Sequence, residues 1–198
     1  MPAISSFIDS YVNQIPSLFT EEIKTKITTL AHDLFSAWIE GRNVFICGNG
    51  GSAANALHIS NDLFYGIGAC GKPPHKAGIN IEALSSNSAI LTCLANDEGY
   101  ESIFSQQLIT KARKNDLLIV LSGSGNSVNI INAVTAAKEM GVKSYGIVAF
   151  DGGKVKDLCD VTLHFHVKDM QIAEDTQLLV GHMCMQWLNF NKHKNKLS

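Results

Sequence analysis

Two short glycine- and serine-rich segments could bind an anion, because each follows an apolar run and precedes a stretch that favours helix. The first spans 48–52 and reads GNGGS, and the second spans 122–127 and reads SGSGNS. Small residues let the backbone approach an anion closely, while free N–H groups and the helix dipole attract negative charge. The two segments together predict a cradle for a phosphorylated, polyhydroxylated small molecule. Further hydroxyl donors come from Ser52, Ser122, Ser124 and Ser127.

The spacing inside the two segments narrows the class of ligand. Neither is followed by the Gly-Lys-Ser/Thr of a P-loop, and neither has the Gly-x-Gly-x-x-Gly spacing of a dinucleotide site. A single phosphate group therefore fits better than NAD or a nucleoside triphosphate. One glycine-rich turn after a strand often serves only to let the next helix pack close to the sheet. Two such turns with serines at similar positions favour a binding site.

His58 and Asp62 are candidates for chemistry at the reactive end of the ligand. They lie four residues apart on the helix that the first turn opens, so they share a helix face. A histidine with a carboxylate four residues later is often a surface pair. Here the apolar neighbours Leu57, Ile59 and Leu63 favour a site instead.

Glu174 and His182 lie eight positions apart in the last predicted helix. Eight residues rise about 12 Å along a helix axis, so one ion can hardly bind both from a single straight helix. Two alternatives remain. Either Glu174 precedes the regular helix and bends inward, or the two residues serve sites built from different subunits. His182 could also be a satisfied core histidine beside Gly181 and Met183.

Polar residues elsewhere are weaker candidates. Asn96 and Asp97 end an apolar helix at a polar turn, where their amide and carboxylate could bind sugar hydroxyls rather than only stop the helix. His164 and His166 alternate with apolar residues and share one face of a strand. They are interpreted as strand residues first, with metal ligation as the less favoured alternative.

The elements that position these residues alternate along the chain. Such alternation predicts an α/β fold with a doubly wound parallel sheet flanked by helices. Ligands of such sheets bind at the carboxyl ends of the strands, where both turns fall. Strands are predicted near 44–47, 79–84, 117–121, 144–149 and 161–166, and helices near 52–65, 86–94, 100–113, 127–140 and 171–190.

Before the first strand, residues 1–41 carry apolar positions at three- and four-residue intervals and predict a helical arm that is part of the same fold. Pro16 interrupts the pattern, and Thr20 is a plausible start of the second helix. We expect the arm to pack against another subunit. The α/β domain is predicted over 42–190 and a flexible tail over 191–198.

Composition sets further limits. At 198 residues with 45% apolar content, the chain suits one domain with a full core. A net charge of −2 provides no broad basic field, so no nucleic-acid ligand is expected. No apolar run is long enough to span a bilayer and no signal pattern opens the chain, so we expect no membrane partner and a cytoplasmic location.

Taken together and in this order, the motifs resemble the sugar isomerase (SIS) domain family, and within it the phosphoheptose isomerases. The resemblance covers nearly the whole chain and implies a flavodoxin-like sandwich. It also implies that the protein is an enzyme, active as a homotetramer with sites at subunit boundaries. The motifs are the two turns, the His58 helix, Asn96-Asp97, Asp151-Gly152-Gly153 and Val180-Gly181-His182.

Carried over by position, the resemblance implies the roles of individual residues. Asp62 and His182 would be the acid–base pair. Substrate contacts would fall at Asn49, Gly50, Gly51, Asp62, Asn96, Asp97 and Glu174, and phosphate contacts at Ser52, Ser122, Gly123, Ser124 and Ser127. A divalent metal ion would be bound by His58, Asp62, Glu174 and His182.

Three positions depart from the family pattern. Asp62 stands where the family normally has Glu, Glu174 stands where it has Gln, and Gly66 stands where it has Arg. A shorter base must sit closer to the substrate carbon or act through water. The extra carboxylate should hold a divalent cation more tightly, and two carboxylates with two imidazoles suit zinc. The changes suggest a subgroup acting on a related sugar phosphate.

The expected reaction is an aldose–ketose isomerisation through an enediol(ate), with Asp62 as base and His182 as acid or the reverse. The resemblance implies sedoheptulose 7-phosphate as substrate and D-glycero-D-manno-heptose 7-phosphate as product. Alternatives are an isomerase for a related sugar phosphate, a sugar-phosphate sensor, and a non-catalytic scaffold that binds the replication initiator DnaA, as near relatives do.

Overall fold

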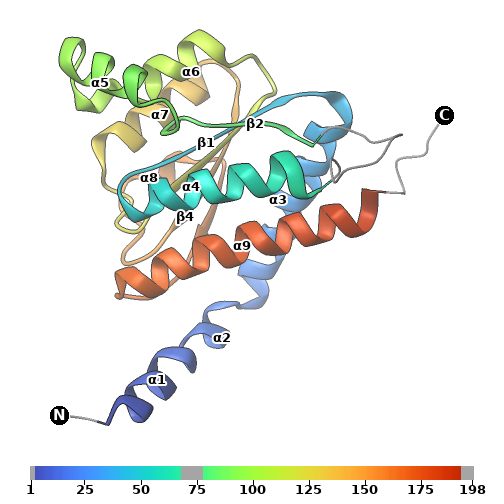
Figure 1. Ribbon diagram of the computed structural model, residues 1–198, viewed down its shortest axis with the longest axis vertical. Helices are drawn as coiled ribbons and strands as arrows, with labels where there is room; N and C mark the ends of the chain where they lie inside the picture. Colours follow the sequence, from blue (N-terminus) through green and yellow to red (C-terminus); the bar gives the residue numbers. More distant parts are fainter. Residues whose placement is uncertain (1–2, 68–77, 193–198) are drawn as a thin grey trace.

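The computed structural model describes residues 3–67 and 78–192, so the predicted tail lies outside the described residues from position 193 onward. Its centre is a five-stranded parallel sheet in the order β2-β1-β3-β4-β5 (Figure 1). This is the strand order of flavodoxin-like folds, and it confirms the predicted doubly wound sheet. The strands are β1 (Asn43–Gly48), β2 (Asn80–Ala83), β3 (Leu117–Ser122), β4 (Lys143–Val148) and β5 (Val161–His164).

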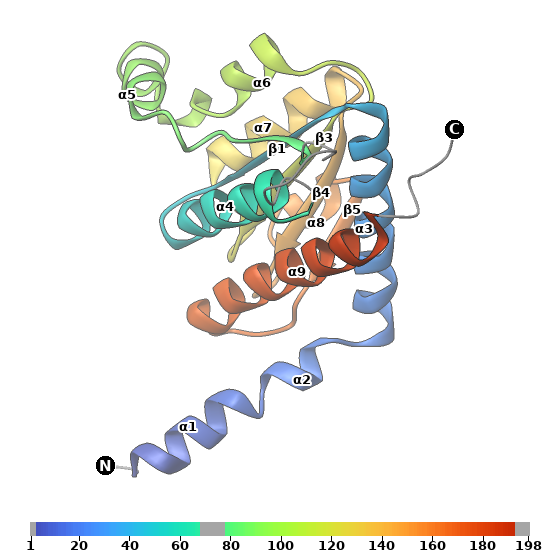
Figure 2. The same cartoon turned by 45° about the vertical axis from the view of Figure 1, so that its right-hand side comes forward.

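Helices cover both faces of the sheet, as the near-continuous apolar runs of its strands require. One face packs against α3 (Glu21–Glu40), α4 (Gly51–Asn61) and α9 (Met170–Asn191), and Figure 2 shows these three helices on the same side. The other face of the sheet packs against α5 (Ser88–Asp97), α6 (Ser105–Lys111), α7 (Val128–Glu139) and α8 (Val155–Leu158).

No helix within the described ranges is both long enough and apolar enough to cross a membrane.

The N-terminal residues form α1 (Ile4–Val12), α2 (Ile15–Leu18) and then α3. Pro16 lies in the first turn of α2, and the Thr20 hydroxyl accepts a hydrogen bond from the Ile23 N–H, which caps α3 as predicted. No residue of α1 is buried, and the helix extends away from the sheet (Figure 2). The hydroxyl of Tyr11 donates a hydrogen bond to Asp175 Oδ2 at 2.7 Å. The pKa of Tyr11 is raised to about 12, mainly because the hydroxyl is partly desolvated and secondly because of this hydrogen bond.

Most element boundaries differ from the sequence prediction by a few residues, α8 was not predicted, and three elements differ in kind or length. The helix expected over 52–65 changes at Asp62 into a π-helical turn, Asp62–Gly66. The helix expected over 100–113 splits into a 3₁₀ turn, Tyr100–Ser102, and α6. The strand expected over 161–166 ends at His164, because the backbone turns back on itself where the Val167 N–H donates to the Phe165 carbonyl.

Packing of α3 on the sheet gives a first prediction. Leu34 is 1% exposed on the inner face of α3, whereas Ile39 on the same helix is 47% exposed. Leu34→Ala should lower the free energy of unfolding by about 2–5 kcal/mol, because it leaves a cavity in the core. Ile39→Ala should cost less than about 1 kcal/mol. Urea denaturation of both variants is the measurement, and equal losses would contradict this placement of α3.

Candidate active site

The site depends on the close packing of α4 against α9, which run in the same direction side by side (Figure 1). A Cβ added at Gly181 would lie 2.6 Å from Cγ1 of Ile59, so only a glycine lets the two helices approach this closely. Nearer the start of both helices, Gln177 donates to the Ser52 hydroxyl and accepts from Asn55, both at 3.0 Å. These buried hydrogen bonds fix the register of the two helices.

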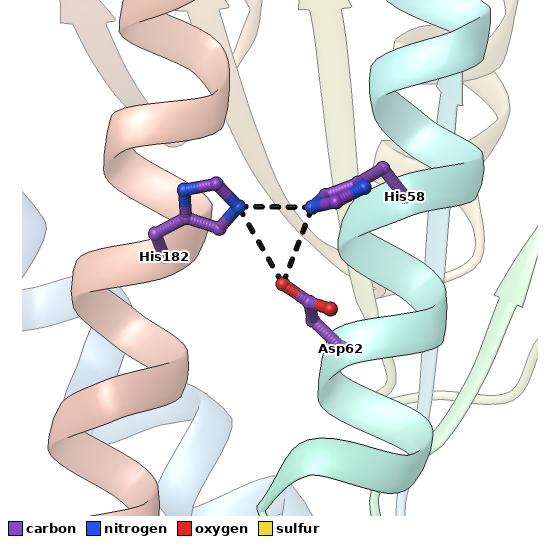
Figure 3. Close-up of side chains that lie close together, drawn as sticks. All are labelled: His58, Asp62 and His182. Carbon is purple, nitrogen blue, oxygen red and sulfur yellow. Dashed lines mark hydrogen bonds and ion pairs between the residues drawn. The ribbon is translucent and has the colours of Figure 1, made fainter.

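Next to the contact between Ile59 and Gly181, three titratable side chains meet (Figure 3). His58 Nε2 and His182 Nε2 lie 2.9 Å apart, and each lies 3.5 Å from Asp62 Oδ2. His58 and Asp62 come from one face of α4 and its π-helical extension, as their spacing predicts, and His182 comes from α9. The structure therefore brings together residues that are more than a hundred positions apart in the sequence.

The spacing of these three atoms suits a metal ion. Ligands of a tetrahedral zinc ion, at bonds of about 2.0–2.1 Å, lie about 3.3 Å from one another. The donor atoms of His58, Asp62 and His182 all lie within 4.8 Å of one another, and two imidazoles with a carboxylate are a common zinc set. The donors therefore fit a divalent transition metal.

The group is open to solvent on one side in the single chain. The side chains of His58, His182 and Asp62 are 51%, 40% and 20% exposed. Asp62 lies where α4 becomes a π turn, and its N–H donates to the carbonyls of both His58 and Ile59. Such π turns are rare and often occur at functional sites.

The two glycine- and serine-rich turns lie beside each other, because β1 and β3 are neighbouring parallel strands. Asn49 in the first turn and Asn129 near the start of α7 exchange two amide hydrogen bonds, at 2.9 and 2.8 Å. Tyr100 donates to Asn49 Oδ1 at 3.0 Å. A polar cluster thus fixes the two turns relative to each other at the carboxyl edge of the sheet.

The serines of the turns keep their hydroxyl hydrogens available to a ligand. Ser122 Oγ accepts from the Gly125 N–H at 3.1 Å, and Ser124 Oγ accepts from the Asn126 N–H at 3.3 Å. Ser127 is at the N-cap of α7, but within the described part of the chain its side chain makes no capping bond. The Ile130 N–H already bonds to the Ser127 carbonyl at 3.1 Å, so among the described residues the donors of α7 that can face an anion are those of Val128 and Asn129.

Glu174 lies apart from the group of His58, Asp62 and His182. It is inside the regular helix α9, which excludes the alternative that it precedes the helix and bends inward. Its carboxylate lies against Gly51 at the start of α4, where an added Cβ would collide with it. A carboxylate is favourable at this helix N-terminus. In one chain, therefore, Glu174 does not join the three-residue group.

The remaining predicted site residues lie at the end of α5, at the start of α4 and directly after β3. Asn96 and Asp97 are exposed at the end of α5, where the Asn96 amide donates to Asp97 Oδ1 at 2.6 Å. The following 3₁₀ turn brings Tyr100 onto Asn49, which connects this end of α5 to the first turn. Gly50 is the N-cap of α4, and Gly123 directly follows β3 and is buried.

Sequence reasoning missed several polar residues that hold the site together. These residues have no motif of their own, and a buried partner far away in the sequence gives each its role. The one available signal was the position of Asn129, two residues after the second turn. The missed residues are Asn55, Tyr100, Asn129 and Gln177.

Known proteins share the sequence pattern and the fold of this chain. The SIS domain model matches residues 7–149, which makes this an SIS-domain protein. A phosphoheptose isomerase of Aliarcobacter butzleri is 37% identical over 147 residues, covering 74% of this chain and 75% of that protein. One of Aneurinibacillus thermoaerophilus is 33% identical over 184 residues, covering 91% and 89% respectively. The chain belongs to the phosphoheptose isomerase family.

A solved structure supports the same fold. The structure of phosphoheptose isomerase from Neisseria gonorrhoeae matches with a TM-score of 0.84 and 24% identity, covering 94% of this chain and 96% of that one. At this identity the likeness concerns the fold alone.

The polar cluster between the turns gives the second prediction. Asn129→Ala should lower the free energy of unfolding by about 1–3 kcal/mol, because it leaves the Asn49 amide without its partner. Asn132 on the same helix bonds only to the carbonyl of Glu101 at the surface, so Asn132→Ala should cost less than about 1 kcal/mol. Urea denaturation compares the two variants. An Asn129→Ala variant as stable as the control would show that the amide pair does not fix the turns.

Proposed function

We propose that this protein isomerises sedoheptulose 7-phosphate to D-glycero-D-manno-heptose 7-phosphate through an enediol(ate). The observation that carries the proposal is the meeting of His58, Asp62 and His182 on the helix pair that starts at the first turn. The similar proteins are named phosphoheptose isomerases, which supports a heptose phosphate as the substrate. Gly51 and His58 are separated by a helix rise of about 10 Å, which an extended seven-carbon sugar phosphate can bridge.

In this proposal the turns bind the phosphate end of the substrate. The hydroxyls of Ser52, Ser122, Ser124 and Ser127, with the backbone N–H of Gly123 and the first turn of α7, supply neutral donors and the positive end of a helix dipole. The sugar hydroxyls are bound by Asn49, Asn96 and Asp97 and by the backbone of Gly50 and Gly51. These contacts orient the carbonyl end toward Asp62.

Asp62 and His182 then transfer protons. One group removes the proton on the carbon next to the carbonyl, and the other protonates oxygen or the neighbouring carbon. Support comes from the 3.5 Å separation of Asp62 Oδ2 and His182 Nε2, since both face the same space. The π turn at Asp62 supports the assignment because it shifts the carboxylate relative to a continuous α-helix.

His58, Asp62 and His182 would also hold a divalent metal ion, for which zinc is the proposed identity. When bound, the ion supplies positive charge that stabilises the negative oxygen of the enediolate. Asp62 has a second carboxylate oxygen, Oδ1, which remains for proton transfer when Oδ2 faces the imidazoles. The carboxylate of Asp62 can therefore serve both purposes, whereas Nε2 of His182 either binds the ion or carries the transferred proton.

Glu174 enters the proposal through a second copy of the chain. Glu174 and His182 of one chain are assigned to sites on different copies of a homotetramer, in which Glu174 contacts substrate and metal. We place the tetramer in the cytoplasm. Such an assembly is supported by exposed apolar side chains on α1 and near the group of His58, Asp62 and His182. They are Ile4, Phe7, Ile8, Val12, Leu57, Phe64 and Met183.

The third prediction tests the reaction. Purified protein incubated with sedoheptulose 7-phosphate and zinc should form the heptose phosphate, followed by NMR, and chelation should stop turnover. Asp62→Asn should lower kcat by about 10²–10⁴-fold with normal folding, because a general acid or base contributes this much. The matched control is Asn61→Ala, an exposed neighbour that should keep full activity.

The outcomes separate the parts of the proposal. Full activity in Asp62→Asn would overturn the assignment of the base, while the fold and the substrate would stand. If the wild-type protein with zinc binds the sugar phosphate but does not convert it, the enzymatic function itself is wrong. Circular dichroism of each variant excludes loss of folding as the cause.

The fourth prediction tests whether a site is shared between copies. Glu174→Ala and His182→Ala should each be inactive alone. Co-expressed as mixed oligomers, they should regain activity, because one copy then supplies Glu174 and the other supplies His182. No recovery in mixed oligomers would place both residues in the site of a single chain. An active Glu174→Ala variant would remove Glu174 from the site altogether.

A further inference from the structure

A second group of histidines lies at the β5 edge of the sheet, outside the site described above. It lines a cavity of about 880 Å³ between the edge strand β5 and the start of α3. In the sheet, β3 and β4 separate β5 from the strand that leads into α4. The side chains at this cavity include His164, His166, Glu22, Lys26 and Thr162. None of them has a role in the proposed isomerisation.

The ring of His164 is held in the tautomer that a metal ligand needs. Its Nε2 lies 2.9 Å from the carbonyl oxygen of Phe150, and a carbonyl can only accept, so Nε2 carries the hydrogen. The lone pair of the neutral ring is then on Nδ1. Metal-binding histidines typically donate their other N–H to a backbone carbonyl in this way.

His166 places a second imidazole beside the first. The ring centroids of His164 and His166 lie 4.0 Å apart, with planes tilted by 52°. At this separation, a nitrogen of each ring can approach the spacing of about 3.3 Å that two zinc ligands have. Two adjacent imidazoles are typical ligands of zinc, copper and nickel.

Glu22 supplies a carboxylate at the same cavity. It lies in the first turn of α3, pairs with Lys26 at 2.6 Å, and its side chain is 74% exposed. Glu22 lines the same cavity as both rings, and its exposed carboxylate can turn away from Lys26 without leaving solvent.

We propose that His164, His166 and Glu22 form a second binding site, for a divalent transition metal ion of the zinc, copper and nickel class. Among the described residues, only the group of His58, Asp62 and His182 already has three ligand atoms within 4.8 Å of one another. The second site therefore forms when Glu22 turns from Lys26 to the imidazoles. A bound ion joins α3 to the edge strand β5. The site is independent of the proposed isomerase activity.

The test uses the full-length chain carrying His58→Ala and His182→Ala, which disables the first group. Titration calorimetry with Zn²⁺ should show one remaining site per chain. Adding His166→Ala or His164→Gln should weaken that site at least about tenfold. The glutamine retains a donor for the Phe150 carbonyl, so its effect reports the lost ligand rather than lost structure. Adding His32→Ala, an exposed imidazole on α3 outside the cavity, should change nothing.

Cu²⁺ gives an independent readout. Electron paramagnetic resonance of the Cu²⁺-loaded double variant should show coupling to two nitrogens, and His166→Ala should reduce it to one. The proposal is overturned if the double variant binds no Zn²⁺, or if affinity is unchanged by His166→Ala and His164→Gln. Unchanged affinity in Glu22→Gln would remove Glu22 from the ligand set.

Discussion

The close contact of α4 with α9 is the constraint on which the rest of the site depends. Gly181 against Ile59 sets the distance between the helices, and the hydrogen bonds of Gln177 with Ser52 and Asn55 set their register. The imidazoles of the two helices meet at 2.9 Å only because distance and register are both fixed. Buried hydrogen bonds are costly to break, so the geometry of the group of His58, Asp62 and His182 depends on the same contacts that stabilise the core.

The parallel sheet supplies the other half of the arrangement. All five strands run in one direction, so their carboxyl ends collect at one edge, and the helices that follow them begin there. Positive ends of the α4 and α7 dipoles therefore converge near the two turns. The carboxylate of Glu174 lies at the N-terminus of α4. At the N-terminus of α7, the side chain of Ser127 makes no capping hydrogen bond to the described residues.

Much of this could be predicted from the sequence, because the signals are local. Apolar runs, helix periodicity and the Thr20 cap predicted the sheet and its helices, and the spacing of His58 and Asp62 predicted their shared face. The pairing of Asn49 with Asn129 could not be predicted, since it joins residues eighty positions apart. The π turn was also missed, because it changes the backbone hydrogen bonding of a segment whose sequence has no pattern that distinguishes a π turn from an α-helix.

The bond between Tyr11 and Asp175 joins the N-terminal helix α1 to the start of α9, one residue from Glu174. Because α1 has no buried residue of its own, this contact is a principal link between it and the domain. Any event that repositions α1, such as association of copies, would also act on the end of α9 that approaches Gly51. Association and ligand binding would then be linked equilibria, each altering the other by the same free energy.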